Sequence, residues 1–129
     1  MVVCDGKEKI LLVDDNEIQR SVIKIQLEND YDVATATSGR EAVERLVQGF
    51  VPDLILLDIL MPDMDGWETF GRIRAVSLLH QIPIVFLSAL NDNKEIDRAY
   101  KMGASDFITK PYNDLDFQNR IKKVLGKIA

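Results

Sequence analysis

Three short runs of large apolar residues constrain the fold of this chain more than any other feature of its sequence. They are residues 10–13 (ILLV), 54–57 (LILL) and 84–87 (IVFL), and a polar residue follows each run at once. Runs of this kind are typical of strands that are buried on both faces, as in a parallel sheet. Asp58 follows the second run, and its carboxylate would be costly inside such a strand. We therefore predict that Asp58 lies where the chain leaves the core.

Polar residues follow four of the predicted strands in this way. Besides Asp58 they are, in chain order, Asp14, Asp15, Ser88 and Lys110. Because the carboxyl ends of parallel strands meet at one edge of a sheet, where ligands bind in open α/β folds, we expect these side chains to form a common site. Three acids, a hydroxyl and a lysine suit a metal ion and a phosphoryl group.

Helical patterns separate the predicted strands, which we place at about residues 9–13, 33–36, 54–57, 82–87 and 107–110. Helices are expected at about residues 17–29 and 66–76 and after three predicted N-caps, Ser38, Asn91 and Asn113. Alternating strands and helices with right-handed crossovers predict an α/β fold, with a five-stranded parallel sheet that is doubly wound by helices on both faces.

Side-chain patterns add detail to two of the predicted helices. Ile18, Val22 and Ile25 form one apolar face of the first helix. Glu41 lies three residues after Ser38, which is the spacing of a capping box at the start of the second helix.

No repeat, linker or low-complexity tract interrupts the pattern. We therefore expect one domain over residues 1–129, with a core of about residues 9–127 and no visible effector domain.

The charge balance of the chain argues against nucleic acid as a partner. Lys and Arg total 16 against 21 for Asp and Glu, which gives a net charge of −5 and argues against direct nucleic acid binding by this domain.

A single cysteine, Cys4, favours a reducing compartment, and His80 is interpreted as a surface residue. No apolar stretch approaches the about 20 residues that span a bilayer, and no signal peptide is evident, so we expect a cytoplasmic protein without membrane contact.

The three predicted site acids must take up a proton, pair with cations or bind a metal ion. Two carboxylates about 4 Å apart repel by roughly 4 kcal/mol at an effective dielectric constant of about 20. Asp14, Asp15 and Asp58 together therefore favour a hard cation such as Mg²⁺, which takes one or two carboxylates and keeps several waters. Successive strand residues point to opposite faces, so Asp14 and Asp15 converge only if the chain turns there. For that pair alone, solvated loop acids are the alternative.

Each remaining site residue has a role in phosphoryl chemistry. The Asp58 carboxylate can act as a nucleophile and form an acyl phosphate. Lys110 can neutralise the phosphoryl oxygens, and the Ser88 hydroxyl can donate a hydrogen bond to them.

These motifs together resemble the response-regulator receiver domains of two-component signalling, over about residues 9–127. The matching residues are Val13-Asp14-Asp15, Leu57-Asp58, Met61-Pro62, Asp65-Gly66, Ser88-Ala89, Gly103-Ala104 and Lys110-Pro111. The resemblance implies a flavodoxin-like strand order, 2-1-3-4-5, and a cis peptide bond between Lys110 and Pro111.

The resemblance also implies a function for each site residue. Asp58 would be phosphorylated by a histidine kinase or a histidine phosphotransfer protein. Asp15, Asp58 and the main-chain carbonyl of Leu60 would hold Mg²⁺, and Asp14 would assist through a water. Lys110 and Ser88 would contact the phosphoryl group. Such a domain is no enzyme in the ordinary sense, because it catalyses only its own phosphorylation and autodephosphorylation.

Phosphorylation of a receiver is read out on another part of its surface. The resemblance makes Ser88 and Phe107 the switch residues, although simple core packing would also explain an aromatic residue at position 107. The output would appear on the face formed by the fourth helix, the fifth strand and the fifth helix. It would control a downstream effector protein or domain, and a phosphorylation-dependent dimer is a further expectation.

Two other functional classes share part of this pattern. A phosphohydrolase of the haloacid-dehalogenase type also uses an aspartate at a strand end, but it typically carries a second aspartate two residues later, where this chain has Leu60. A flavodoxin-like electron carrier would need a Ser/Thr-rich phosphate loop after the first strand, and none is present.

Overall fold

The computed structural model describes residues 7–76 and 81–127, so Cys4, His80 and Ile128 lie outside the described part. The strands are β1 (Lys9–Val13), β2 (Asp32–Ala36), β3 (Leu54–Leu57), β4 (Ile84–Ser88) and β5 (Asp106–Thr109). The helices are α1 (Glu17–Leu27), α2 (Gly39–Val47), α3 (Gly66–Ala75), α4 (Asn93–Met102) and α5 (Asp114–Val124). Among residues 7–76 and 81–127, no helix is long and apolar enough to cross a bilayer.

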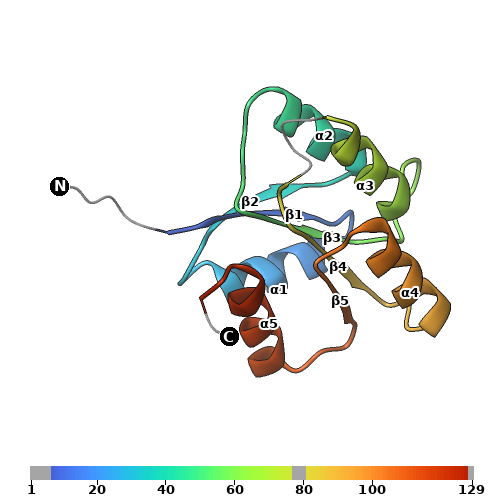
Figure 1. Cartoon of the computed structure of the whole chain (residues 1–129). Coiled ribbons are helices and arrows are strands. Elements are labelled where there is room, and N and C mark those ends of the chain that lie inside the picture. Colours follow the sequence, from blue (N-terminus) through green and yellow to red (C-terminus); the bar gives the residue numbers. More distant parts are fainter. Residues whose placement is uncertain (1–6, 77–80, 128–129) are drawn as a thin grey trace.

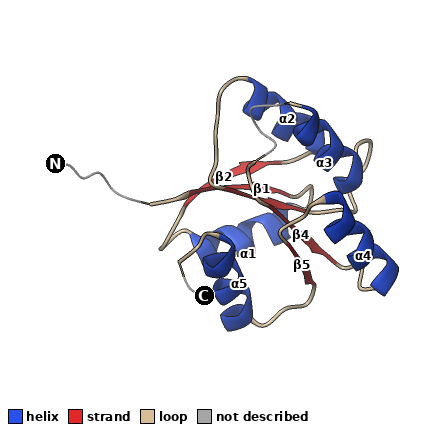
Figure 2. Ribbon diagram, in the orientation of Figure 1, coloured by secondary structure: helices blue, strands red, loops and turns tan. Residues whose placement is uncertain are grey.

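The strands form one parallel sheet in the order β2-β1-β3-β4-β5 (Figures 1 and 2). This confirms the predicted α/β class and the flavodoxin-like strand order. β3 lies at the centre, and all four of its residues are buried, as a run of aliphatic residues at that position requires. The order reverses between β1 and β3, and ligands of doubly wound folds bind outside the strand ends at such a point.

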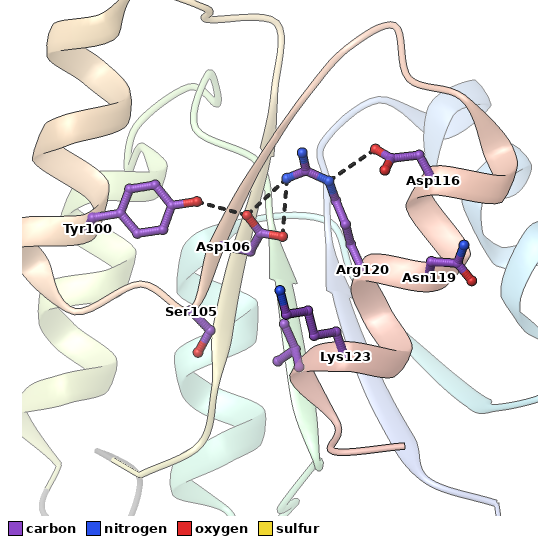
Figure 3. Close-up of a pocket in the computed structure, with 8 residues that line it drawn as sticks. Tyr100, Ser105, Asp106, Asp116, Asn119, Arg120 and Lys123 are labelled. Carbon is purple, nitrogen blue, oxygen red and sulfur yellow. Dashed lines mark hydrogen bonds and ion pairs between the residues drawn. The ribbon is translucent and has the colours of Figure 1, made fainter. Parts of the chain in front are cut away.

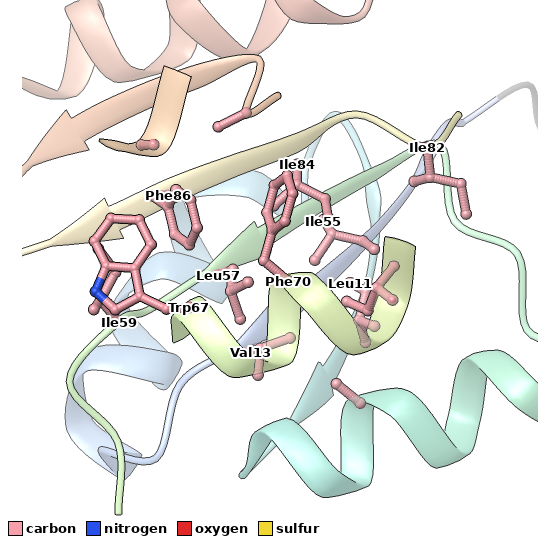
Figure 4. Packing of buried hydrophobic residues seen from close by; sticks show 14 of the residues in the cluster. Leu11, Val13, Ile55, Leu57, Ile59, Trp67, Phe70, Ile82, Ile84 and Phe86 are labelled. Carbon is pink, nitrogen blue, oxygen red and sulfur yellow. The ribbon is translucent and has the colours of Figure 1, made fainter. Parts of the chain in front are cut away.

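Two apolar layers lie on the two faces of the sheet. α1 and α5 cover one face, and α2, α3 and α4 cover the other (Figure 1). On the second face, Trp67 and Phe70 of α3 pack on Phe86 of β4, with ring centroids 5.0 and 5.6 Å apart (Figure 4). This packing fixes the start of α3 against the middle of the sheet.

The apolar face that we predicted for α1 is not the one that packs on the sheet. Ile18, Val22 and Ile25 are 76%, 49% and 65% exposed, whereas Ile23 and Leu27 are almost fully buried. Successive helix residues lie about 100° apart, so both stripes cannot face the sheet at once. The helix buries Ile23 and Leu27 against the layer that contains Ile10 and Leu12 and leaves the second stripe in solvent.

The predicted helix caps are correct at two of three positions. Ser38 and Asn113 cap α2 and α5 through their side-chain oxygens. The cap of α4 is Asp92 and not Asn91, since Asp92 Oδ1 accepts the Lys94 N–H at 2.8 Å.

The capping box at α2 is also shifted by one residue. Glu41 accepts from the main-chain N–H and the hydroxyl of Thr37, at 2.6 and 2.9 Å, and not from the N–H of Ser38. Its own N–H donates to the Ser38 hydroxyl at 3.0 Å, so only that half of the predicted box is formed.

Candidate phosphoryl and metal site

The main chain brings the predicted site residues to one edge of the sheet. The Asp58 N–H donates to the Val13 carbonyl at 3.0 Å, which continues the β1–β3 ladder by one residue. The Lys110 N–H donates to the Ser88 carbonyl at 2.8 Å at the ends of β4 and β5. The Lys110–Pro111 peptide bond is cis, as the resemblance implied. Backbone pairing between strands therefore fixes the positions of the Cα atoms of these site residues.

Three carboxylates converge at this edge. Oxygen atoms of Asp14, Asp15 and Asp58 all lie within 4.8 Å of one another, so the predicted turn after β1 does form. The Asn16 N–H donates to Asp14 Oδ1 at 2.9 Å and so stabilises the turn. Asp14 and Asp58 are buried, whereas Asp15 is exposed. The set therefore offers hard oxygen ligands from one side and access for water from the other, which suits a divalent cation.

Lys110 is the cation of this site. Its Nζ lies 3.5 Å from Asp14 Oδ2 and 3.9 Å from Asp58 Oδ1. It also donates a hydrogen bond to Gln19 Oε1 at 2.5 Å. The ammonium therefore compensates part of the negative charge while it stays beyond hydrogen-bonding distance of the Asp58 carboxylate.

Burial dominates the electrostatics of Asp58. It raises the pKa of the carboxyl group from 3.8 to about 6, against the opposing effect of the Lys110 ammonium. Repulsion from Asp14 and Asp15 adds to the raised pKa, and the Ile59 N–H, which donates to Asp58 Oδ1 at 2.8 Å, lowers it. A cation placed among the three carboxylates would favour the ionised form, which is the form that can attack phosphorus.

The predicted switch residues are both buried. Ser88 is the last residue of β4, and its hydroxyl oxygen accepts the Leu90 N–H at 3.2 Å, which leaves the hydroxyl hydrogen to donate elsewhere. Phe107 is 5% exposed and packs on Phe86 with ring centroids 6.1 Å apart. Phe107 therefore packs in the core, as the alternative interpretation expected, and its role as a switch residue stays a prediction. The Leu60 side chain, two residues after Asp58, is 56% exposed.

Two residues near the site were not identified from the sequence. Gln19 contacts the Lys110 ammonium, and Arg20 Nη1 donates to the Asp14 carbonyl at 2.8 Å. Both lie in the first turn of α1, the helix that directly follows Asp14 and Asp15 in the sequence. Side chains in the first turn of a helix lie close to the loop before it, so this position in the sequence is the signal that could have identified them.

Known proteins that are similar to this chain are response regulators and receiver domains. The chain is 38% identical over 119 residues to the transcriptional regulatory protein CrdR of Helicobacter pylori, which covers 91% of this chain and 54% of CrdR. It is 36% identical over 118 residues to the two-component response regulator ORR6 of Oryza sativa, covering 89% of this chain and 69% of ORR6. The chain spans about half the length of the first few curated relatives that it matches.

A solved structure gives the same family, and the family model matches most of the chain. The signal receiver domain of a histidine kinase from Syntrophus aciditrophicus is 36% identical, with a TM-score of 0.82 over 94% of this chain and 92% of that one. A receiver domain from Pseudomonas aeruginosa PAO1, described with a magnesium ion coordinated in its active-site cleft, is 29% identical, with a TM-score of 0.83 over 94% of this chain and 99% of that one. The model of the response regulator receiver domain matches residues 10–122, and the chain belongs to that family.

Proposed function

We propose that Asp58 accepts a phosphoryl group from a histidine kinase or a histidine phosphotransfer protein, and that the phosphorylated form controls a downstream effector. The observation that carries the proposal is the position of Asp58. Asp58 is 8% exposed, and its carboxylate shares the strand edge with two further carboxylates within 4.8 Å and lies 3.9 Å from the Lys110 ammonium. Nucleophile, metal ligands and a fixed positive charge are the parts that phosphoryl transfer needs.

The transfer is a displacement at phosphorus. An Asp58 carboxylate oxygen forms a bond to phosphorus while the bond from phosphorus to the donor's imidazole nitrogen breaks. The electron pair of that bond stays on the imidazole, and the product on Asp58 is an acyl phosphate. With acetyl phosphate as the donor, the broken bond is the one to the acetate oxygen, and acetate leaves.

Mg²⁺ fits the acidic cluster. We propose that Asp15, Asp58 and the Leu60 main-chain carbonyl hold the ion and that Asp14 assists through a water, which leaves positions for phosphoryl oxygens. The bound ion would supply positive charge where the transferred group is most negative. Lys110 would move to a phosphoryl oxygen, and the Ser88 hydroxyl would donate to another.

The proposal predicts labelling that depends on Mg²⁺. We expect the wild type, incubated with acetyl phosphate and Mg²⁺, to gain the mass of one phosphoryl group, and we expect no gain when Mg²⁺ is chelated. Intact-mass spectrometry measures the gain, and reduction of the acyl phosphate followed by fragmentation locates it. Labelling that persists in chelator, or that maps to Asp14 or Asp15, would contradict the assignment of Asp58.

Effector contact is proposed on the face formed by α4, β5 and α5. Asp106 of β5 connects the two helices, because it accepts from the Tyr100 hydroxyl at 2.8 Å and from Arg120 Nη1 at 3.0 Å (Figure 3). Arg120 also pairs with Asp116 at 3.0 Å. A shift of α4 would therefore change the hydrogen bonds of this face, and an effector that contacts it can distinguish the two states.

Ser88 is the proposed connection between the site and this face. Its hydroxyl oxygen accepts from Leu90 in the loop that leads to α4. Rotation of that hydroxyl toward a phosphoryl group would weaken the bond to Leu90 and release the loop, while Phe107 adjusts its packing on Phe86.

We expect Ser88→Ala to accept phosphate at Asp58 but to transmit the change poorly. In the wild type, beryllofluoride with Mg²⁺ should change amide exchange between residues 91 and 112, because BeF₃⁻ stands in for the phosphoryl group. In Ser88→Ala these changes should be largely lost, and Ser21→Ala, at an exposed position of α1, serves as the control. Exchange that changes in the wild type only around Asp14, Asp58 and Lys110 would show that the proposed output face is wrong.

The proposal extends to the effector and to the oligomeric state. Several relatives are named transcriptional regulators, and the chain matches about half of their length. We propose that the output partner is a protein or an effector domain and not nucleic acid bound by this domain, whose net charge is −5. Phosphorylation-dependent pairing of two copies and action in the cytoplasm, beside the kinase, belong to the same proposal.

A further inference from the structure

We propose that Gln19 is a positioning residue for the reaction at Asp58, and that its side-chain carbonyl holds the Lys110 ammonium away from the Asp58 carboxylate. The inference rests on the proposed function of Asp58. In it, the Gln19 side chain controls how easily the phosphoryl donor and the metal ion reach the Asp58 carboxylate. Gln19 touches neither the donor nor the metal in this account. It acts through Lys110 alone.

The distances around the ammonium carry the argument. Lys110 Nζ lies 2.5 Å from Gln19 Oε1, 3.5 Å from Asp14 Oδ2 and 3.9 Å from Asp58 Oδ1. Of these three contacts, only the one to Gln19 is a hydrogen bond, and it is shorter than an ordinary N–H···O bond. The charged partners attract the ammonium more strongly than an amide does, so its position next to Gln19 needs a specific acceptor there.

Gln19 enters the site from an anchored turn of α1. Its N–H donates to the Asn16 side chain at 2.9 Å, and the Asn16 N–H donates to Asp14 Oδ1 at 2.9 Å. Arg20, the next residue, donates to the Asp14 carbonyl at 2.8 Å. The first turn of α1 is thus tied to the acidic cluster at several points, which fixes where the Gln19 side chain begins.

The chemistry of the amide suits this role. A neutral acceptor fixes the ammonium without adding a fourth negative charge beside Asp14, Asp15 and Asp58. Lys110 and Gln19 also line one apolar depression together with Val22 and other residues of α1.

Loss of the Gln19 acceptor should let the ammonium move onto the carboxylates. Lys110 would then hydrogen-bond Asp58 and Asp14 directly and occupy oxygens that the metal and the incoming phosphoryl group need. We expect Gln19→Leu to require roughly fivefold to tenfold more Mg²⁺ and acetyl phosphate for half-maximal labelling, which is the size of effect expected from loss of one solvent-exposed hydrogen bond. The maximal labelling rate should stay close to that of the wild type.

The test separates positioning from a structural effect. Labelling rates are measured over a range of acetyl phosphate concentrations, and Mg²⁺ affinity is measured by calorimetry on the unphosphorylated protein. Ser21→Leu places the same new side chain at another exposed position of α1 and should behave like the wild type. In a Lys110→Ala background, Gln19→Leu should have no further effect on Mg²⁺ affinity, because the group it positions is gone.

Each outcome decides between two explanations. If the wild type is labelled and Gln19→Leu matches Ser21→Leu, the role of Gln19 is wrong and the proposed function stands. If Gln19→Leu weakens Mg²⁺ binding equally with and without Lys110, Gln19 does not act through the lysine and the inference is overturned. If the wild type is not labelled at Asp58, the proposed function fails, and this inference fails with it.

Discussion

Asp58→Asn is expected to abolish phosphoryl labelling and, in metal-free buffer at neutral pH, to raise the free energy of unfolding by about 1–2 kcal/mol. The amide has no carboxylate oxygen with which to attack phosphorus, so labelling should be lost completely. The gain in stability has a separate cause. Burial raises the pKa of Asp58 from 3.8 to about 6, so the folded protein holds an ionised carboxylate that it disfavours.

The sign of the pH dependence follows from the raised pKa. Between about pH 4 and pH 6 the folded state binds more protons at Asp58 than the unfolded state, so the stability contributed by this group falls as the pH rises. About two pH units correspond to about 3 kcal/mol at most, and partial solvent screening reduces this to the smaller value given above. The advantage of Asp58→Asn should therefore be full above pH 6 and should nearly vanish at pH 4.

Urea unfolding of both proteins in chelator, at pH 4 and pH 7.5, measures this difference. Asp30→Asn removes a carboxylate at an exposed position and should change stability little at either pH. Added Mg²⁺ should stabilise the wild type more than Asp58→Asn and so narrow the difference in unfolding free energy, because the variant lacks one of the proposed metal ligands. An Asp58→Asn protein that is no more stable than the wild type at pH 7.5 would show that burial of the carboxylate has no such cost.

The grouping of the candidate site residues was predictable from the sequence because the backbone fixes it, whereas the roles of these residues stay predictions. Once residues 54–57 are a central strand, the Asp58 N–H continues the ladder to Val13, and the ladder between β4 and β5 brings Lys110 to Ser88. No side-chain detail is needed for this step. Parallel pairing places the ends of neighbouring strands together, and the polar residue after each apolar run then enters the site.

The features that the sequence did not predict depend on which of two adjacent residues with similar chemistry is buried or caps a helix, or on contacts between distant side chains. Val22 and Ile23 are both apolar and adjacent, and only packing against β1 decides that Ile23 is buried. Asn91 and Asp92 are both good caps, and the first turn of α4 selects the second. The hydrogen bond from Lys110 to Gln19 spans 91 residues of chain and depends on the rotamers of two long side chains. Local patterns contain no information on contacts of that kind.

Gly66→Ala is expected to lower the free energy of unfolding by about 3 kcal/mol and to impair labelling at Asp58. A Cβ atom on Gly66 would lie 2.4 Å from the Asp58 carbonyl oxygen and 2.6 Å from the Ile59 Cα, both of which are main-chain atoms. The Gly66 N–H also donates to the Ile59 carbonyl at 2.9 Å, so the start of α3 is tied to the segment that it would collide with. No rotamer change can relieve a clash between main-chain atoms and a Cβ.

The clash can be relieved only by moving α3 or the end of β3. α3 is fixed by Trp67 and Phe70 against Phe86, and Asp58, the proposed nucleophile, directly follows β3, so either movement costs packing energy or displaces Asp58. Gly71 in the same helix is the matched control, because nothing lies within 4 Å of a Cβ built there. Gly71→Ala should be stabilising by about 0.5–1 kcal/mol, since alanine has the better helix propensity. Urea unfolding measures both effects, and a Gly66→Ala protein as stable as Gly71→Ala would contradict the close approach of α3 to the Asp58 main chain.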